Sequence, residues 1–378
     1  MRRWTNFSDA ARQKARAITP PDYILLSIFL ILAGLGLVTM YSASAILAET
    51  NHGDSLYFLK RQFSFFIVGI FLMMFFTKNE YTNLRKWIKP VLILTGISLF
   101  IVLFTHPVAG VRRWFRIGPI GIQPSEFAKL ALLIYTADFL DRNNSRIIQQ
   151  PKALLPFAGV VMVILTLIGF APDLGTPILL FAVILLVLFA AGVSQKYLLS
   201  ILPLAVLVIT EELIRKPYRV KRLMTFMSPW ENAQGAGYQL MQALLAVGSG
   251  GWFGNGLGSS KLKLMYLPAC HTDFIFPVIA EELGLMGSMF IICLFTGVLI
   301  RGIKIAKDAP DMFGSLLALS ITCLLVFQAF FNIAMATGFI PTKGLPLPFF
   351  SYGGSSLLVS MMCAGILLNI SARRRRVI

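Results

Sequence analysis

The chain has 378 residues, of which 57% are hydrophobic and only 13% are charged, and its mean hydropathy is +0.76. Soluble globular proteins carry about 25% charged residues, and half that share cannot cover a water-soluble body of this size. The composition therefore excludes a soluble enzyme, a disordered or fibrous chain and a disulfide-built secreted module, and it predicts an all-α polytopic membrane protein. The net charge of +17 is typical of basic loops that set topology and contact anionic lipid, rather than of nucleic-acid binding.

Ten apolar segments follow one another along the chain and predict ten transmembrane helices. Spanning a bilayer takes about 20 apolar residues, so the shorter segments must extend into the residues that flank them. The narrowest break is Pro172-Asp-Leu-Gly-Thr-Pro177, where two prolines and a glycine predict a tight turn between helices. The chain thus divides into a basic N-terminal segment (1–21), one ten-span domain (22–370) with a long loop (214–270), and a basic tail (371–378). The segments are 22–48, 58–77, 90–105, 125–140, 153–170, 177–192, 197–213, 272–300, 312–337 and 351–370.

Lysine and arginine counts predict the orientation of these spans. An even number of spans places both termini on one side of the membrane. The termini and loops on that side hold 20 Lys and Arg residues, whereas the short loops opposite hold six. Because basic residues are retained in the cytoplasm, we expect both termini there and the loop 214–270 outside.

Most of the unusual polar motifs fall in the connections on the predicted outer side. Functional residues concentrate in loops that a rigid scaffold positions, so we expect recognition or chemistry at the extracytoplasmic surface. That side has no ATP, which argues against a nucleotide-driven reaction. The motifs are Gly110-Val-Arg-Arg-Trp114, Gln123-Pro-Ser-Glu126, Pro172-Asp-Leu-Gly-Thr176, His271-Thr-Asp273 and Pro341-Thr-Lys-Gly-Leu-Pro-Leu-Pro348.

The long loop combines basic and glycine-rich sequence. Five basic residues lie within 215–222, and a glycine-rich run covers 248–258. Glycine-rich backbone beside basic residues can bind a phosphate, but the pattern is equally that of a flexible surface loop with snorkelling side chains. Between the two runs, Tyr238–Val247 has the pattern of a short amphipathic or re-entrant helix.

Charged residues next to or inside the predicted spans are candidates for function. The guanidinium forks of Arg112 and Arg113 suit phosphate oxygens, although both side chains are also placed to anchor the chain at the interface beside Trp114. Glu126 and Lys129 lie three residues apart on one helical face. They form either a self-neutralising structural pair or part of a lined cavity.

Asp273 is the most informative acid in the chain. It stands at the outer edge of the eighth predicted span, before Phe274-Ile-Phe276, and His271 lies two residues away. A carboxylate with an apolar wall behind it is suited to general-base chemistry, whereas the alternative is a helix N-cap. Glu281 and Glu282 lie about two turns deeper, where acids must be paired, line a wet cavity or belong to a proton pathway.

Two classes of function remain open on these residues alone. One is an outward-facing transferase with a lipid-borne phosphate substrate, and the other is a transporter or flippase with intramembrane charges. The four cysteines are far apart and show no metal-binding spacing, so no cofactor is evident.

The order of the motifs resembles that of the SEDS family of bacterial cell-wall polymerases over residues 22–370. Two stretches, Pro341-Thr-Lys-Gly-Leu-Pro346 and 256–268, resemble the division branch, FtsW, more than the elongation branch, RodA. The remaining matching stretches are Gly110–Trp114, Gln123–Lys129, Pro172–Thr176, Gly237-Tyr-Gln239, His271–Phe276, Glu281–Gly284 and Pro348–Ser356.

The resemblance implies a ten-span peptidoglycan glycosyltransferase of the bacterial inner membrane, with lipid II as its substrate and a β-1,4 glycan strand as its product. It implies that Asp273 is the essential aspartate, that Arg112 or Arg113 is the outer arginine, and that Lys129 is the intramembrane lysine. It also implies a class B penicillin-binding protein, a transpeptidase, as partner, beside other division or elongation proteins and membrane lipids. Further substrate-binding candidates in the matching motifs are Gln123, Glu126, Asp173, Tyr238, Gln239, His271, Thr272 and Lys343.

The sequence departs from the family pattern in three places. Ala269 stands where the family commonly has a glutamate, which puts in doubt any scheme with two carboxylates sharing a proton or a metal in this loop. Pro177 and Pro277 replace small residues near the starts of spans, where proline is best tolerated.

The resemblance leads to a mechanistic hypothesis in which Asp273 takes the proton from the acceptor's 4-hydroxyl group. Arg112, Arg113 and Lys343 then stabilise the departing diphosphate, and Mg²⁺ or Mn²⁺ would be a suitable helper for such a leaving group. The rival hypotheses are a lipid II flippase that uses Glu126, Lys129, Glu281 and Glu282, and a scaffold that only positions the transpeptidase.

Overall fold

The computed structural model describes residues 20–107, 111–118, 120–171, 173–200, 237–260, 271–342 and 344–373, together with scattered positions between 203 and 230. The described part is mostly helical, as the composition predicts. Its helices are α2 (Tyr23–His52), α3 (Tyr57–Lys78), α4 (Leu84–Val102), α5 (Pro124–Gln149), α6 (Leu155–Phe170), α7 (Gly175–Ala190), α10 (Tyr238–Ser249), α11 (Ile275–Asp308), α12 (Met312–Ala336) and α13 (Gly354–Ser371).

Six described helical segments are long and apolar enough to cross a membrane, and α7 is a shorter apolar helix. The predicted span at 197–213 lies mostly outside the described residues. Helix α5 is not among the six because it carries charged residues, although it is deeply packed. The six segments are α2, α3, Lys152–Phe170 (a short 3-10 turn, Pro151–Leu154, running into α6), α11, α12 and α13.

The chain order of the elements follows the sequence prediction, with two differences. The connection between α4 and α5 contains an antiparallel hairpin of β1 (Phe115–Ile117) and β2 (Ile120–Ile122), which the all-α prediction did not include. Helix α11 is not one straight span, because Gly284 inside it has φ 66° and ψ −165°. The predicted turn between α6 and α7 is confirmed, since α6 ends at Phe170 and α7 begins at Gly175.

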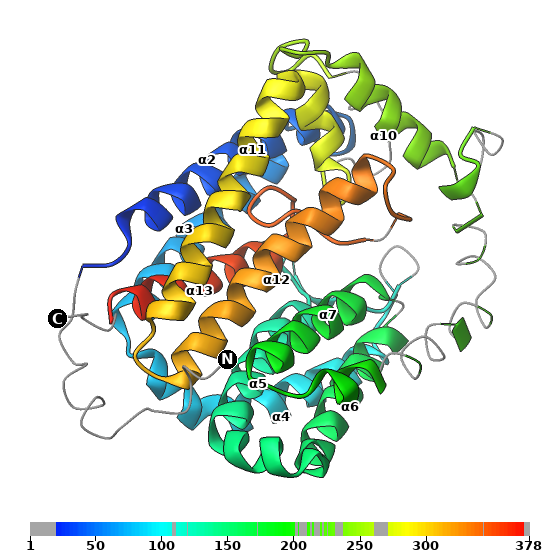
Figure 1. Ribbon diagram of the computed structural model, residues 1–378. Coiled ribbons are helices and arrows are strands. Elements are labelled where there is room, and N and C mark those ends of the chain that lie inside the picture. Colours follow the sequence, from blue (N-terminus) through cyan, green and yellow to red (C-terminus); the bar gives the residue numbers. More distant parts are fainter. Residues whose placement is uncertain are drawn as a thin grey trace.

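Helices α12 and α13 form the centre of the bundle. Of their most apolar windows, 67% and 83% of residues are buried, compared with 17% for α3 and 22% for Lys152–Phe170, so the last two face outward. In Figure 1, α4 to α7 lie together in one half of the molecule, and α2, α3, α11 and α13 lie in the other. Helix α12 contacts α11 on one side and both α5 and α7 on the other, and so joins the halves.

Polar contacts between helices gather at two opposite ends of the bundle. We call the first the terminal end. There the carboxylate of Asp22, at the start of α2, pairs with Arg301, and the backbone N–H of Asp22 donates to Ser371 Oγ at the end of α13 (3.0 Å). At the other, which we call the motif end, Gln123 N–H donates to Ser355 Oγ at the start of α13 (3.0 Å). The motifs predicted to share one side of the membrane therefore meet at one end of the fold.

Candidate functional site

Asp273 precedes a broken helix. Gly284 divides α11 into a short arm (275–283) and a long arm (285–308), and Figure 1 shows the chain turning sharply between them. The main chain of a neighbouring loop fills the break: Asn255 N–H donates to Glu281 O (3.0 Å) and Leu285 N–H donates to Gly251 O (2.9 Å). Backbone groups freed by a helix break must find such partners inside a membrane. The loop therefore fixes the angle of the short arm, at whose start Asp273 stands.

A main-chain segment backs the carboxylate of Asp273. A Cβ atom placed on Gly344 would lie 3.0 Å from Asp273 Oδ2, so a larger residue there would crowd the carboxylate. Asn332 on α12 donates from Nδ2 to Asp273 O (2.8 Å) and to Leu345 O (2.7 Å). The N-cap residue of α11 is Phe274, without a side-chain capping bond, so the alternative reading of Asp273 as the N-cap is wrong.

His271 is buried beside this segment and is electrically neutral near pH 7. Its ring lies between Phe58 (centroids 5.0 Å apart) and Tyr352 (5.6 Å), and its carbonyl oxygen accepts from Tyr352 N–H (2.9 Å). Burial lowers the pKa of His271 to about 4. Among the described residues, its Nδ1 atom has no hydrogen-bond partner. His271 is thus available as a neutral hydrogen-bonding group and not as a cation for a phosphate, and Thr272, half-buried, lies between it and Asp273.

The intramembrane charges of α5 form a self-neutralising pair, which is one of the two alternatives that their spacing left open. Lys129 Nζ lies 2.7 Å from Glu126 Oε2, and both side chains are almost completely buried. Lys129 also donates to Gln328 Oε1 on α12 (2.9 Å), and Gln328 Nε2 donates to Pro346 O (2.9 Å). The pair is therefore connected to the same segment, 344–346, that backs Asp273.

The two arginines contact main-chain carbonyls at helix ends. Arg112 is exposed and donates to Leu103 O after α4 (3.2 Å), whereas Arg113 Nε donates to Ala171 O after α6 (2.7 Å). Both stand at the motif end, beside the β1–β2 hairpin. Their exposed or half-exposed guanidinium groups remain suited to an anionic headgroup. Lys343, the third predicted cation, lies outside the described residues, as does the basic run 215–222 apart from Val220.

The other predicted site residues lie in three places at the motif end. Gln123 joins α5 to α13 through its backbone, and its side chain donates to Ser125 Oγ (3.0 Å). Asp173 accepts from Thr176 N–H (3.1 Å) and Thr176 Oγ1 (3.0 Å), and so binds the first turn of α7 from outside its N-cap, Leu174. Tyr238 and Gln239 open α10, which confirms the predicted short helix and which packs on α11.

The two adjacent acids of the short arm are held by hydroxyl and N–H donors. Ser42 Oγ on α2 contacts both carboxylate oxygens of Glu282 (2.6 and 2.8 Å). Ser260 donates from its N–H to Glu282 Oε1 (3.3 Å) and from its hydroxyl to Glu281 Oε2. Both acids are buried, so these bonds fasten the loop that fills the break to the short arm.

Sequence reasoning missed Gln328, Asn332, Ser42 and Ser260. A signal existed for the two amides, because polar side chains one turn apart inside an apolar span are costly unless they are paired. Nothing comparable marked Ser42, because serine is common in membrane helices as a donor to its own backbone, or Ser260 in the loop.

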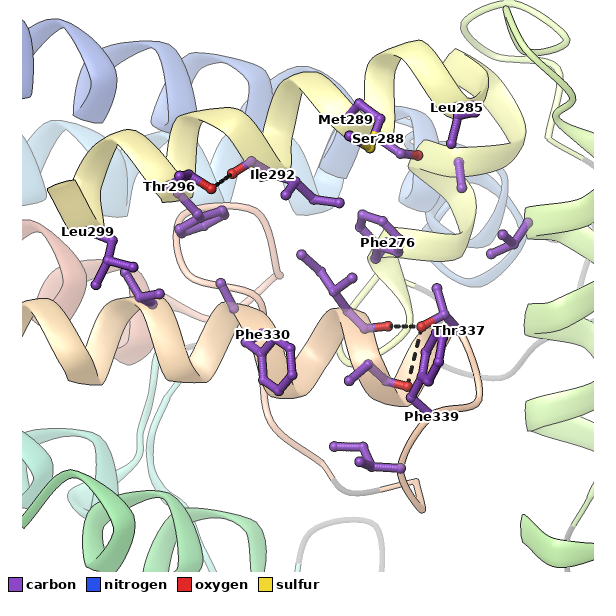
Figure 2. A pocket seen from close by; sticks show the side chains of 18 of the residues that line it. Phe276, Leu285, Ser288, Met289, Ile292, Thr296, Leu299, Phe330, Thr337 and Phe339 are labelled. Atoms are coloured by element: carbon purple, nitrogen blue, oxygen red, sulfur yellow. Dashed lines mark hydrogen bonds between the residues drawn. The ribbon is translucent and has the colours of Figure 1, made fainter. Parts of the chain in front are cut away.

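A separate groove beside α12 is apolar. It has a volume of about 870 Å³ and lies between the two arms of α11, α12 and the end of α10 (Figure 2). Its few polar side chains, Ser288, Thr296 and Thr337, donate to carbonyl oxygens of their own helices. The wall therefore suits hydrocarbon or an apolar helix, and a charged headgroup fits better at Asp273, which is not among the residues that line the groove.

Comparison with known proteins identifies the family. The model of the FtsW/RodA/SpoVE family, described as cell cycle protein, matches residues 23–376. The chain belongs to this family. It is 42% identical over 354 residues to the probable peptidoglycan glycosyltransferase FtsW of Trichlorobacter lovleyi, with 93% of each chain covered. It is 39% identical to the stage V sporulation protein E of Bacillus subtilis, covering 94% of this chain and 98% of that one.

Solved structures show that the family members share this fold. One similar chain comes from a structure that describes the structural coordination of polymerization and crosslinking by a peptidoglycan synthase complex. The two chains superpose with a TM-score of 0.77 at 26% sequence identity, and the match covers 93% of this chain and 97% of the other. Against the rod shape determining protein RodA of Thermus thermophilus the TM-score is 0.68 at 26% identity, covering 93% and 96%. The SEDS resemblance in the motifs is thereby confirmed, and the FtsW-like branch agrees with the curated relatives named FtsW.

Proposed function

We propose that the chain polymerises lipid II into glycan strands during septal cell-wall synthesis, as a peptidoglycan glycosyltransferase of the FtsW type. The observation that carries the proposal is the placement of Asp273 at the start of a fixed short arm, with its carboxylate against Gly344 at the motif end. Homologues named probable peptidoglycan glycosyltransferase FtsW cover almost the whole chain, which supports the same reaction.

The membrane arrangement is part of the proposal. Ten spans, with 197–213 as the seventh, place both termini in the cytoplasm of the bacterium and the motif end at the outer face of the inner membrane. The contacts between the start of α2 and the end of α13 support an even number of spans, because they bring both ends of the domain to one side of the membrane. The excess of Lys and Arg on that side supports its assignment to the cytoplasm.

The chemistry requires a base and a stabilised leaving group. An α-linked lipid diphosphate becomes a β-glycoside, so the displacement at the anomeric carbon inverts its configuration. Asp273 accepts the proton of the acceptor's 4-hydroxyl while the new C–O bond forms and the bond to the diphosphate breaks. Arg112 and Arg113 compensate the negative charge that develops on the diphosphate. Neutral His271 and Thr272 supply hydrogen bonds beside the base.

A divalent cation is a common helper for diphosphate leaving groups. The described residues contain no group of three or more His, Cys, Asp or Glu side chains arranged to hold one. We therefore assign no step to a metal.

We further propose a class B penicillin-binding protein as the partner that crosslinks the new strand. The likeness to a chain from a peptidoglycan synthase complex that couples polymerization and crosslinking supports this class of partner.

The contacts of the intramembrane acids argue against the flippase. A headgroup pathway needs charged groups free to meet the substrate, but Glu126 and Lys129 neutralise each other, and Glu281 and Glu282 bind serines that hold the loop. These four residues therefore have structural contacts that a moving headgroup would have to break.

The test is strand synthesis by the purified full-length chain, with a matching transpeptidase and lipid II in vesicles. We expect Asp273→Asn to reduce polymerisation by about 10²-fold or more. The matched control is Asp54→Asn, which removes the carboxylate of an exposed aspartate paired with Lys60 (2.8 Å) and should leave the rate unchanged. Full polymerisation by folded Asp273→Asn would refute the proposal, and lipid transfer across the vesicle without polymer would favour the flippase.

A further inference from the structure

One amide side chain connects the buried ion pair of α5 to the segment behind Asp273. Gln328 accepts from Lys129 Nζ at Oε1 (2.9 Å) and donates from Nε2 to Pro346 O (2.9 Å). An ammonium group has only donors, so it determines which end of the amide faces it. The charge on Lys129 therefore also determines that the N–H end of Gln328 faces residue 346.

The next turn of α12 repeats the arrangement. Asn332, four residues later and so on the same helical face, donates to Leu345 O (2.7 Å) and Asp273 O (2.8 Å). Two consecutive carbonyls of one segment, 345 and 346, are thus bound by two amides of one helix. Since the adjacent Gly344 lies against the Asp273 carboxylate, the position of this segment determines the space available to the carboxylate.

Burial makes these contacts strong. The side chains of Lys129, Gln328 and Asn332 are at most 3% exposed. Hydrogen bonds in such surroundings are not weakened by competing water, and an unpaired member is costly. The described hydrogen bonds connect Gln328 to the Asp273 carboxylate through residues 344–346.

We propose that Gln328 is a positioning residue, which transmits the state of the Glu126–Lys129 pair to the Asp273 carboxylate through the segment 344–346. This inference rests on the proposed function of Asp273. A purely structural role, in which Gln328 only satisfies two polar groups, is the competing explanation and predicts that its loss lowers the amount of folded protein without altering the catalytic step.

The experiment compares four full-length variants with the wild type in the lipid II polymerisation assay. Gln328→Met removes both bonds. Gln328→Glu keeps an acceptor for Lys129 but loses the donor to Pro346, and it remains informative if the methionine variant does not fold. Glu126→Gln with Lys129→Met removes the ion pair without leaving a lone buried charge. The fourth variant combines this neutralised pair with Gln328→Met. The matched control is Ser320→Ala, which removes a buried hydroxyl of α12 that, in the described part of the chain, donates to Leu316 O.

We expect each Gln328 variant to lower kcat at least 10-fold per folded molecule, with KM for lipid II within about twofold, and to shift the acid limb of the pH–rate profile. A loss of folded protein would lower that profile without moving it. We also expect the combined variant to be no slower than the slower of its two components, because both changes act through one contact. Independent, multiplying effects, or Gln328 variants that behave like Ser320→Ala, would overturn the inference.

A failure of the positioning role of Gln328 can be distinguished from a failure of the proposed function. If the wild type polymerises and Asp273→Asn does not, normal rates in the Gln328 variants refute the positioning role alone. If the wild type forms no polymer with its transpeptidase, the proposed function itself fails.

Discussion

The motif end contains two buried acidic clusters, and they are stabilised in different ways. Glu126 on α5 has a cation 2.7 Å away, whereas Glu282 on the short arm of α11 receives the hydroxyl of Ser42 and the N–H of Ser260. The first cluster connects rigid helices, and the amide of Gln328 extends it to Asp273. The second fastens a loop to a helix break. An ion pair thus lies on one side of the site, and main-chain hydrogen bonds together with donors from Ser42 and Ser260 fasten the short arm on the other.

The largest effect is expected where the loop crosses the break. A Cβ atom on Gly254 would lie 2.1 Å from Glu282 O, and the residue has φ +78°, so Gly254→Ala must displace the loop or the short arm. We expect a loss of more than about 3 kcal/mol of stability, seen as little monodisperse protein in detergent.

Gly248→Ala is the control for this prediction, because it lies in the neighbouring helix α10 with nothing within 4 Å of the added atom. Alanine there should be neutral or slightly stabilising, since it is the better helix former. A well-folded Gly254→Ala variant would show that the break tolerates movement.

The ion pair gives the next largest effect. Lys129→Met leaves Glu126 buried without its cation, which should cost about 3 kcal/mol and lower the melting temperature in detergent. Adding Glu126→Gln should recover most of that loss, because a buried pair replaced by neutral groups is often nearly neutral in stability. If the single and double variants melt together, Glu126 does not depend on Lys129, and the contrast between the clusters is lost.

The sequence allowed the first cluster to be predicted but not the second. Glu126 and Lys129 are three residues apart, so helical periodicity alone brings them together. The break at Gly284 depends on hydrogen bonds from residues about thirty positions earlier, and a glycine inside an apolar run gives no sign of them. The helical class, the short helix α10 and the turn before α7 were likewise predictable, because each depends on local pattern.

The site residues, too, could be predicted from the sequence only where they depend on local pattern. Asp273 and His271 could be named from their motif, but the amides that hold their surroundings could not be assigned, because Gln328 and Asn332 find their partners at residues 129, 273, 345 and 346 across the bundle. The predicted contacts of Arg112 and Arg113 with substrate stay a prediction. Their carbonyl partners at Leu103 and Ala171 depend on how α4 and α6 end side by side.

A smaller effect is expected at the second cluster. Ser42→Ala removes a donor from the buried carboxylate of Glu282 and should cost about 2 kcal/mol. Ser44→Ala is the matched control, two residues away on α2, because its buried hydroxyl contacts only Met40 Sδ (3.5 Å) among the described hydrogen bonds. The difference between their melting temperatures measures how much the neutral donor contributes. Equal values would mean that Ser42 does not stabilise the short arm.

The smallest effect concerns His271 and appears only on acidification. Its pKa is about 4 in the folded protein and about 6.5 when exposed, so the unfolded chain binds more protons between these values. Stability from this residue is therefore fully present above pH 6.5 and is lost as the pH falls toward 4, by about 1 kcal/mol at pH 5.5. Melting curves at pH 7.0 and 5.5 should show a smaller pH dependence for His271→Gln than for the wild type. A His271→Gln variant with the wild-type pH dependence would mean that the folded and unfolded chains bind protons equally at this ring, so that burial does not lower its pKa.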